Sequence, residues 1–568
     1  MKHDDRKDCP YPADGENGIG EGMTRRATFS TLAGVAIVPA AAGTLYASSR
    51  RNPLSPSVDG KINPEGRFFR SSKGAVPRTM AQELADLGAS PEQFGAVGDG
   101  VTDDTAALQA ALDTGKSIRL TQGRDYLIRK RLLLSADGAS ISGGGKIRVA
   151  SDFQINADAN DEYSHMRLLF VTGHDVTIEG VTFDASGAPV GSAVENGFIW
   201  TTAPYTLIRD CLFIGNRKGT CIWALGDAPY LSVLGCRFRD CSGAVFARGR
   251  NSLISNNIII NATDAAIAIN GRTCVGAVVA NNTISNETGA IVPAMIAVEE
   301  CASDWSITGN VMTGANGGAV ACINILDHAV ARGGVIANNV IDGRMADGKI
   351  SKTRNPGAMI SLSPLYHHWI VRGNTISSPP VGNPNSRLAS LPATGGIFEG
   401  NILDGSDASG LSAMVEITPG TLGLTIRANQ SMCFVGGRHY LFSAGSYGNV
   451  PCRFIGGVLL AGEEGINAEI QVKAIRDLTL YIQDIDDCSA RSPLNAATIL
   501  GDRAGYFNAG AWKFPHRIGL NTVMFCDTPP RDGGRLPFAV GDRLHFMAPA
   551  PNGPTSIVRI GNGWVRAG

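Results

Sequence analysis

The sequence has few charged side chains, no closely spaced cysteine pair and no apolar run long enough to span a bilayer. Only 18% of the 568 residues are charged, with 50 basic side chains against 51 acidic ones. This balance excludes a charge-rich disordered chain, a long coiled coil and a globally basic protein, so we expect no nucleic-acid partner. The 12 cysteines include no Cys-x-x-Cys pair and no Cys/His zinc spacing, which predicts buried thiols.

The longest apolar stretch lies near the N-terminus. It runs from Thr31 to Leu45, about 15 residues, whereas a membrane-spanning helix needs roughly 20. Ala40–Ala42 offers a small-residue cleavage site, so residues 1–47 are predicted to be a cleaved export signal. An uncleaved anchor or no signal at all are the alternatives. Arg25-Arg26 resembles a bacterial twin-arginine signal, which implies a periplasmic or secreted protein with no stable membrane insertion after cleavage.

Glycine is abundant, with 70 of 568 residues, or about 12% against an average of roughly 7%. No Gly-X-Y period is present, so collagen is excluded. Many glycines and asparagines with few charges favour short strands joined by tight turns.

Nine segments between residues 176 and 403 repeat one pattern at intervals of 21–35 residues. An apolar residue is followed three positions later by a turn residue, and two positions further on by Phe, Ile, Leu or Met. The turn residues are Val181, Cys211, Cys236, Asn257, Asn282, Asn310, Asn339, Asn374 and Asn401. A second apolar strand follows most repeats. Examples are Cys221–Leu225, Ala244–Ala247, Ala265–Ile269, Ala294–Val298, Ala319–Ile323 and Ala358–Leu362.

This repeat predicts a right-handed parallel β-helix, in which each repeat is one coil stacked on the last at about 4.7–4.9 Å. One coil cannot bury its apolar face alone, so stacking builds the core. An Asn amide both donates and accepts, so the repeated asparagines are predicted to form a hydrogen-bonded ladder. We also expect these asparagines to adopt the left-handed backbone that the turn requires.

A helix is predicted before the coils. In the segment Phe94–Asp113, Thr102 or Asp103 can cap a helix that covers the open first coil. Its apolar stripe would be Ala107, Leu108, Ala111 and Leu112, and Gly98 and Gly100 would allow the preceding turn.

The same segment closely resembles the N-terminal signature of the pectate-lyase-like β-helix superfamily. Arg78–Leu87 is similar to the lead-in of its tailspike-type members. The superfamily includes polysaccharide lyases, glycoside hydrolases, mannuronan epimerases and phage tailspikes. The resemblance implies that Asp99, Asp103 and Asp104 belong to the cap rather than to a catalytic site.

The predicted fold class is all-β, a right-handed parallel β-helix with an N-terminal capping helix and a small C-terminal β piece. The predicted parts are listed in chain order. They are the signal (1–47), a linker and lead-in (48–88), the β-helix (89–410), further coils or a β extension (411–520) and a small β end-piece (521–568).

A candidate site follows from the outward residues at the ends of the second strands, because equivalent positions align across coils. The candidate catalytic residues are Arg248, Arg272, Glu299, Glu300, Asp327 and His328. The candidate substrate-binding residues are Arg250, Asn270, Asn324, Tyr366 and His367. Solvated surface charges are the alternative interpretation of this set. Trp200, Trp223, Trp305 and Tyr205 are either sugar-stacking platforms or packing residues.

The chemistry of this set allows two cleavage reactions. Glu299, Glu300 and Asp327 could supply the two carboxyl groups of a hydrolase, which lie about 5–9.5 Å apart. In a lyase, the arginines would neutralise the carboxylate of a uronate, and His328 or Tyr366 would remove the neighbouring proton.

The leading expectation is an exported enzyme that cleaves a uronate-containing polysaccharide by β-elimination. A glycoside hydrolase, an epimerase and a non-catalytic polysaccharide-binding surface protein remain alternatives. The motifs of polygalacturonases and mannuronan epimerases are absent. No cofactor motif is present, and calcium remains possible without assigned ligands. The chain is expected to be a monomer or, as among tailspike relatives, a homotrimer.

Overall fold

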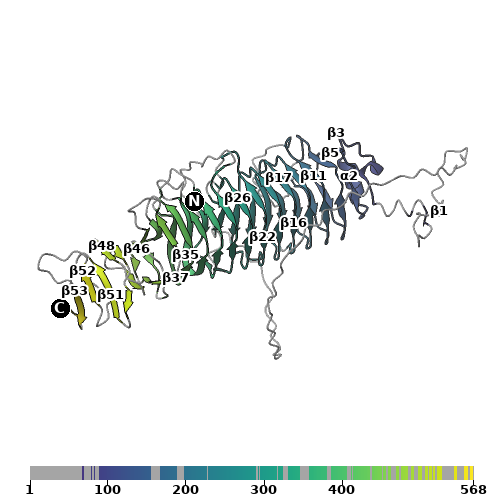
Figure 1. The fold of residues 1–568 in the computed structure, drawn as a ribbon. Helices are drawn as coiled ribbons and strands as arrows, with labels where there is room; N and C mark the ends of the chain where they lie inside the picture. Colours follow the sequence, from purple (N-terminus) through teal and green to yellow (C-terminus); the bar gives the residue numbers. More distant parts are fainter. Residues whose placement is uncertain are drawn as a thin grey trace, which may run out of the picture. The chain divides into compact units, whose positions relative to one another are not determined.

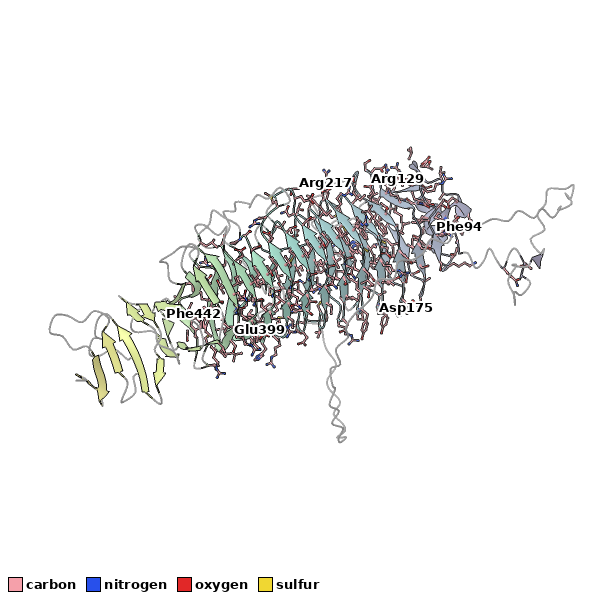
Figure 2. All side chains as sticks on the ribbon, viewed as in Figure 1. Phe94, Arg129, Asp175, Arg217, Glu399 and Phe442 are labelled. Atoms are coloured by element: carbon pink, nitrogen blue, oxygen red, sulfur yellow. The ribbon has the colours of Figure 1, made fainter. Side chains whose placement is uncertain are left out.

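The computed structural model describes the side chains of most residues between 88 and 455 (Figure 2), and mainly strand backbone after that. The undescribed segments up to residue 455 include 1–66, 155–166, 189–196, 324–329, 346–356, 380–385 and 406–410, with shorter gaps such as 227, 290–291 and 316–317. The predicted export signal therefore lies outside the described residues. No helix in the described part of the chain is long and apolar enough to cross a membrane.

Each coil contains three short strands, and each strand pairs in parallel with its equivalent in the next coil (Figure 1). In one coil these are β13 (Leu207–Arg209), β14 (Leu212–Ile214) and β15 (Thr220–Ala224). We call the three stacks sheets I, II and III in this order. The coils thus form the expected right-handed parallel β-helix.

Sheet I contains β13 and its equivalents. These are β7 (Ser140–Ser142), β10 (Thr177–Glu179), β16 (Ser232–Leu234), β19 (Leu253–Ser255), β22 (Val278–Ala280), β25 (Ser306–Thr308), β29 (Val335–Ala337) and β33 (Ile370–Arg372), with β4 (Ile118–Arg119) paired to β7.

Sheet II contains β14 and its equivalents. These are β3 (Asp99–Asp103), β5 (Asp125–Ile128), β8 (Lys146–Val149), β11 (Thr182–Asp184), β17 (Arg237–Arg239), β20 (Ile258–Ile260), β23 (Thr283–Ser285), β26 (Val311–Thr313), β30 (Val340–Asp342), β34 (Thr375–Ser377), β36 (Ile402–Asp404), β38 (Gln430–Phe434) and β42 (Val458–Ala461).

Sheet III contains β15 and its equivalents. These are β6 (Leu132–Leu134), β9 (Arg167–Val171), β12 (Gly197–Thr201), β18 (Gly243–Ala247), β21 (Ile267–Asn270), β24 (Ile296–Glu299), β27 (Val320–Ile323) and β31 (Ala358–Leu362).

Two long strands, β35 (Arg387–Glu399) and β37 (Val415–Arg427), each run from sheet III into sheet I. Parallel pairing continues past residue 410. The strands involved are β39 (Arg438–Phe442), β41 (Cys452–Ile455), β43 (Ala468–Val472), β45 (Leu478–Gln483), β46 (Cys488–Arg491) and β47 (Ala497–Gly501).

After the parallel coils, the C-terminal strands include antiparallel pairs. These strands are β48 (Tyr506–Asn508), β49 (Ala511–Lys513), β50 (His516–Ile518), β51 (Asn521–Cys526), β52 (Arg543–Phe546), β53 (Ser556–Ile560) and β54 (Gly563–Arg566). Three small pairs lie outside the coil sheets. They are β1 (Arg67–Phe68) with β2 (Arg78–Thr79), β28 (Ala331–Arg332) with β32 (Tyr366–His367), and β40 (Gly445–Ser446) with β44 (Ile475–Arg476).

The core is built from columns of matching side chains, as the repeat predicts. Phe183, Phe213 and Phe238 stack with nearly parallel rings, at centroid distances of 5.1 and 4.7 Å. Aliphatic side chains continue the column in register toward the C-terminus. They are Ile259, Ile284, Met312, Ile341, Ile376 and Leu403, all buried. Stacking like on like therefore gives every coil an apolar interior.

The predicted asparagine ladder is confirmed and continues one coil further, to Asn429. From Asn257 onward, each amide nitrogen Nδ2 donates to the Oδ1 of the next ladder residue at 2.9–3.0 Å. The same Nδ2 also donates to a backbone carbonyl of the preceding coil, that of Val233 in the case of Asn257. Because the ladder is buried, its amides satisfy turn groups that water cannot reach.

The left-handed residue of this turn is not the ladder asparagine, which corrects the prediction. The residue before it carries the positive φ. Examples are Asn256, Asn281, Gly309, Asn338, Gly373 and Gly400, with φ between 55° and 66°. The ladder side chain points inward, so the sharp turn is made one position earlier, where the side chain faces outward.

The capping helix α2 (Thr105–Leu112) covers the first coils with Leu108, Ala111 and Leu112 buried. Its N-cap is Asp104, not Thr102 or Asp103 as predicted. The Asp104 carboxylate does not cap the helix, because it accepts the backbone N–H groups of Val97 and Gly98 at 2.7 and 3.1 Å.

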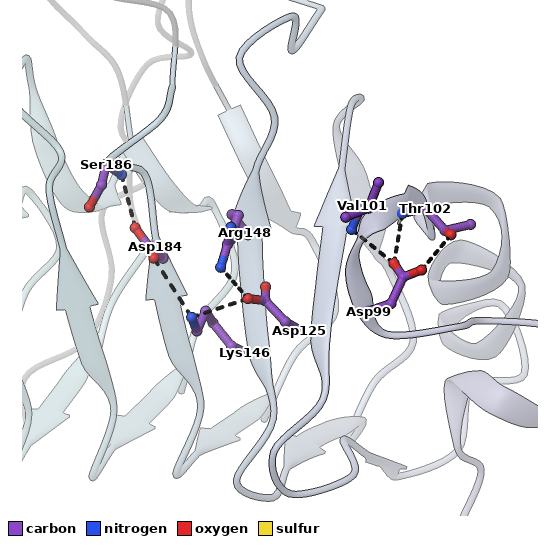
Figure 3. Close-up of polar contacts among 8 residues, drawn as sticks. All are labelled: Asp99, Val101, Thr102, Asp125, Lys146, Arg148, Asp184 and Ser186. Atoms are coloured by element: carbon purple, nitrogen blue, oxygen red, sulfur yellow. Dashed lines mark hydrogen bonds and ion pairs between the residues drawn. The ribbon is translucent and has the colours of Figure 1, made fainter.

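The aspartates around this cap have structural partners. Asp99 accepts the N–H groups of Val101 and Thr102 and the Thr102 hydroxyl, which closes the turn before the helix (Figure 3). On sheet II nearby, Asp125 contacts Lys146 at 3.1 Å and also pairs with Arg148 (Figure 3). These groups hold strands and turns together, in line with a capping role.

The cysteines described by the structure are buried thiols that form no disulfide, as predicted. They are Cys211, Cys221, Cys236, Cys241, Cys274, Cys301, Cys322 and Cys452. Cys236 occupies the ladder position just before Asn257, whose Oδ1 accepts the Cys236 N–H at 2.9 Å. The thiols act here as small apolar side chains.

The turn from sheet III to sheet I also carries a left-handed residue at an equivalent position of successive coils. We call this set the turn column. It comprises Gly138, Asp175, Tyr205, Tyr230, Asn251, Gly276, Asp304, Gly333, His368 and Gly395. A left-handed backbone costs roughly 1–2 kcal/mol for most L-residues, and Gly, Asn and Asp tolerate it best. Tyr205 and Tyr230 are therefore unusual occupants.

Candidate functional site

The outward face of sheet III carries an apolar column. Successive registered positions are Trp200, Trp223, Phe246, Ala268, Ala297 and Ala321. The two indole rings stack at 5.2 Å, and the Arg167 guanidinium lies 4.4 Å from the Trp200 ring centre. Both tryptophans are buried, and Trp305 lies in the core. Of the four aromatic residues considered as sugar platforms, only Tyr205 is exposed, at 51%.

A polar column lies two residues further along the same strands. Asn270 at the end of β21 is in register with Glu299 at the end of β24, and Arg248 precedes them one coil earlier. Asn270 Nδ2 donates to Glu299 Oε2 at 3.1 Å. Two backbone N–H groups, of Gly271 and Ala302, donate to the Glu299 carbonyl and fix the strand end. The structure thus brings three predicted residues into one column.

The Glu299 carboxyl has an unusual environment for a surface acid. Burial raises its pKa above the usual value of 4.5, the Asn270 hydrogen bond opposes this shift, and the charges of Asp264 and Glu300 add to the increase. Asp264 lies in the turn before β21 and was missed in the sequence. Nothing in the local sequence marked Asp264, since its role depends on a neighbouring coil. A raised pKa suits a carboxyl group that donates a proton.

Three predicted arginines lie exposed near this column. Arg248 follows β18 directly, Arg250 lies in the next turn, and Arg272 follows β21. The Arg248 side chain extends over the next coil, where a Cβ on Gly271 would lie 3.5 Å from its Nε. The edge of sheet III beside Glu299 therefore presents positive charge to solvent.

The structure contradicts the predicted substrate-binding role of Tyr366. It is fully buried, and its hydroxyl donates to the Val298 carbonyl at 3.3 Å. Its ring meets Trp305 edge-on at 6.4 Å. Burial also raises the pKa of its hydroxyl, so Tyr366 is neither reachable nor a ready base.

The other predicted residues are divided between described and undescribed parts. His367 is half-buried in β32, and burial together with the neighbouring His368 lowers its pKa. No contact joins His367 to Glu299 among the described interactions. Asn324, Asp327 and His328 lie outside the described residues. Within the described ranges, no group of three His, Cys, Asp or Glu side chains is arranged to hold a metal ion. A calcium requirement stays a prediction.

The stacked parallel coils define the fold class of this protein as a right-handed parallel β-helix. Residues 167–336 match the family model described as "Right handed beta helix region". This match covers the coils that carry Arg248, Asn270 and Glu299.

The chain is similar to two capsule-specific depolymerases of Klebsiella phages. It is 36% identical to one from phage K5-2 over 120 residues, which is 20% of this chain and 14% of the relative. It is 31% identical to one from phage K64-1 over 102 residues, 17% of this chain and 13% of the relative. The chain therefore matches only about a seventh of the length of these relatives.

A similar solved structure is a tailspike protein mutant of E. coli bacteriophage HK620 in complex with a hexasaccharide. The similarity covers 88% of this chain and 93% of the other, with a TM-score of 0.52 and 13% sequence identity. At this identity the likeness concerns the fold.

Proposed function

We propose that this protein is an enzyme that cleaves a polysaccharide at the Glu299 edge of sheet III. The observation that carries the proposal is the half-buried Glu299 carboxyl, with a raised pKa, on a registered column with Asn270. The names of its relatives support the substrate class, because two are capsule depolymerases and one neighbour binds a hexasaccharide. Parallel coils suit a long substrate, since equivalent side chains recur at about 4.8 Å.

Hydrolysis is the reaction that the environment of the Glu299 carboxyl favours. Protonated Glu299 donates its proton to the glycosidic oxygen as the bond from the anomeric carbon to that oxygen breaks. Water adds to the anomeric carbon, and its proton passes to a second carboxylate. Asp264 and Glu300 are the described candidates for that carboxylate, because the charges of both raise the pKa of Glu299. Asn270 holds the Glu299 carboxyl in place.

β-Elimination is the second candidate, and the exposed arginines favour it. Arg248, Arg250 and Arg272 can bind the carboxylate of a uronate through paired N–H groups. Neutralising that carboxylate lowers the cost of removing the proton from the adjacent carbon. The next carbon's bond to the glycosidic oxygen then breaks, the leaving oxygen takes up a proton from solvent, and a carbon–carbon double bond forms. His328 is the candidate base for this step.

The test is incubation with purified acidic capsular polysaccharides, polygalacturonate, alginate and neutral dextran, followed by chain length, reducing ends and ultraviolet absorbance. Both reactions shorten the chain, but only elimination produces an absorbing conjugated double bond. Glu299→Gln should lower the cleavage rate by about 10²–10⁴-fold, the range for loss of a general acid. Glu179→Gln is the control, because Glu179 is a surface residue of sheet I paired with Arg209 at 2.8 Å. Unchanged cleavage by Glu299→Gln would overturn the assignment.

We further propose that the protein acts outside the cytoplasm, because the predicted signal in residues 1–47 carries Arg25-Arg26. Cell fractionation with an antibody tests this location, and purely cytoplasmic protein would contradict it. A monomer or a homotrimer is proposed from the resemblance to tailspikes, and light scattering of the purified protein distinguishes the two.

A further inference from the structure

The turn column contains two tyrosines where most other coils have Gly, Asn or Asp. Tyr205 and Tyr230 have φ of 59° and 62°. Backbone hydrogen bonds show that these positions are equivalent. The Tyr205 N–H donates to the Pro229 carbonyl, and the Tyr230 N–H donates to the Arg250 carbonyl. A bulky aromatic residue in this conformation is an outlier that calls for a reason.

The two tyrosines belong to a repeated tripeptide. Ala203-Pro204-Tyr205 recurs as Ala228-Pro229-Tyr230 in the next coil. Each proline fixes its own φ near −65° and so stiffens the turn that presents the ring. The sequence therefore builds the same strained turn twice, one coil apart.

The rings form an exposed stack. Their centroids lie 4.8 Å apart and their planes differ by 5°. Tyr230 covers one face of Tyr205, yet Tyr205 remains 51% exposed. The stack therefore holds the exposed Tyr205 ring in a fixed orientation at the surface.

Stability does not explain this arrangement. Two left-handed tyrosines cost more than one partly exposed ring pair returns, and Asn251 fills the next position of the turn column without such strain. Strain kept at an exposed site points to a role in binding.

We propose that Tyr205 and Tyr230 form a subsite that binds a pyranose ring of the polysaccharide, distant from the cleavage point. This inference rests on the proposed function for its ligand class. The apolar face of a sugar ring packs on an aromatic face, and each tyrosine hydroxyl offers a hydrogen bond to sugar hydroxyls.

The position of the subsite fits an extended chain. Tyr205, Tyr230 and the coil of Arg248 and Arg250 follow one another at the same edge, and the coils of Asn270 and Glu299 come next. Four coil steps separate Tyr205 from Glu299, or about 19 Å at about 4.8 Å per step. A polysaccharide along this edge would contact the tyrosines, then the arginines, then Glu299.

The test uses the full chain with Tyr205→Asn and Tyr230→Asn combined. Asparagine tolerates the left-handed turn, as Asn251 shows, so the variant keeps the backbone and loses the rings. The matched control combines Tyr205→Phe and Tyr230→Phe, which keeps rings and strain. Affinity for the polysaccharides of the cleavage panel is measured in the Glu299→Gln background, so that the polymer is not degraded, and the melting temperature is measured in parallel.

The expected result is a dissociation constant raised about tenfold or more in the asparagine variant and changed less than about threefold in the phenylalanine variant. The melting temperature of the asparagine variant should not fall, and in the active enzyme the loss should raise KM rather than lower kcat. Unchanged affinity in the asparagine variant, with the polymer still cleaved by the parent, would overturn the subsite and leave the proposed function standing. A parent protein that neither binds nor cleaves any polysaccharide of the panel would overturn both.

Discussion

Replacing Asn310 by alanine tests whether the asparagine ladder holds the coils together. Asn310 Nδ2 donates to Asn339 Oδ1 and to the Val279 carbonyl, both at 3.0 Å. Its Oδ1 accepts the backbone N–H and the Nδ2 of Asn282, both at 2.9 Å. All of these groups are inside the protein, because Asn310 is fully buried.

The size of the effect follows from these contacts. Asn310→Ala removes these four side-chain hydrogen bonds and a longer one from Nδ2 to the Thr308 carbonyl at 3.3 Å. The four shorter bonds each contribute about 0.5–1.5 kcal/mol net, so the expected loss is about 4 kcal/mol, with a range of roughly 2–6. The two Asn282 donors lose their acceptor, and a buried donor without a partner is costly. The loss should concentrate in the coils next to residue 310, since coils of a solenoid stabilise mainly their neighbours.

The assay is urea unfolding of the variant and the parent, combined with hydrogen exchange of the amides in β23, β26 and β30. Val311→Thr is the control, because Val311 is the adjacent residue, is 39% exposed, and threonine keeps its β-branched shape. The control should change stability by less than about 0.5 kcal/mol. A loss below about 1 kcal/mol for Asn310→Ala, or exchange that rises equally in distant coils, would refute the reasoning.

Three further predictions concern other parts of the chain. Asp104→Ala should cost about 2–4 kcal/mol in urea unfolding, because Val97 and Gly98 lose their buried acceptor; an unchanged midpoint contradicts this. The raised pKa of Glu299 means that the folded state favours the protonated form, so stability is lost as pH rises through that pKa. Glu299→Gln should therefore have a higher melting temperature than the parent at pH 7, and this difference should disappear below pH 4.5, the usual pKa of a glutamate. Calorimetry showing a difference that widens on acidification contradicts this. Tyr205→Asn alone should not lower the melting temperature, and a clear drop would mean that the ring is there for stability.

The core columns could be predicted from the sequence because they depend on local spacing. Every inward position recurs at a fixed offset from a ladder residue, so Phe213 and Ile284 were identified from neighbours in the chain. The ladder followed from the chemistry of asparagine. The left-handed position did not, because Asn256 and Asn257 are both suited to it and only the inward direction of one side chain decides between them.

The candidate site was less predictable because it is built between coils joined by turns of unequal length. Asn270 and Glu299 end equivalent strands, so their alignment could be inferred. Tyr366 follows its strand at a longer offset, in the short strand β32, and it is buried in the core, where its hydroxyl reaches the Val298 carbonyl. Tyr230 was overlooked although the repeated Ala-Pro-Tyr tripeptide would have identified it.

The most direct test of the account is size-exclusion chromatography of an acidic polysaccharide after incubation with the parent protein, Glu299→Gln or Glu179→Gln. The account predicts shortened chains with the parent and with Glu179→Gln, and polymer of unchanged length with Glu299→Gln over the same time. Shortening by Glu299→Gln at the parental rate would contradict a cleavage site at this edge of sheet III.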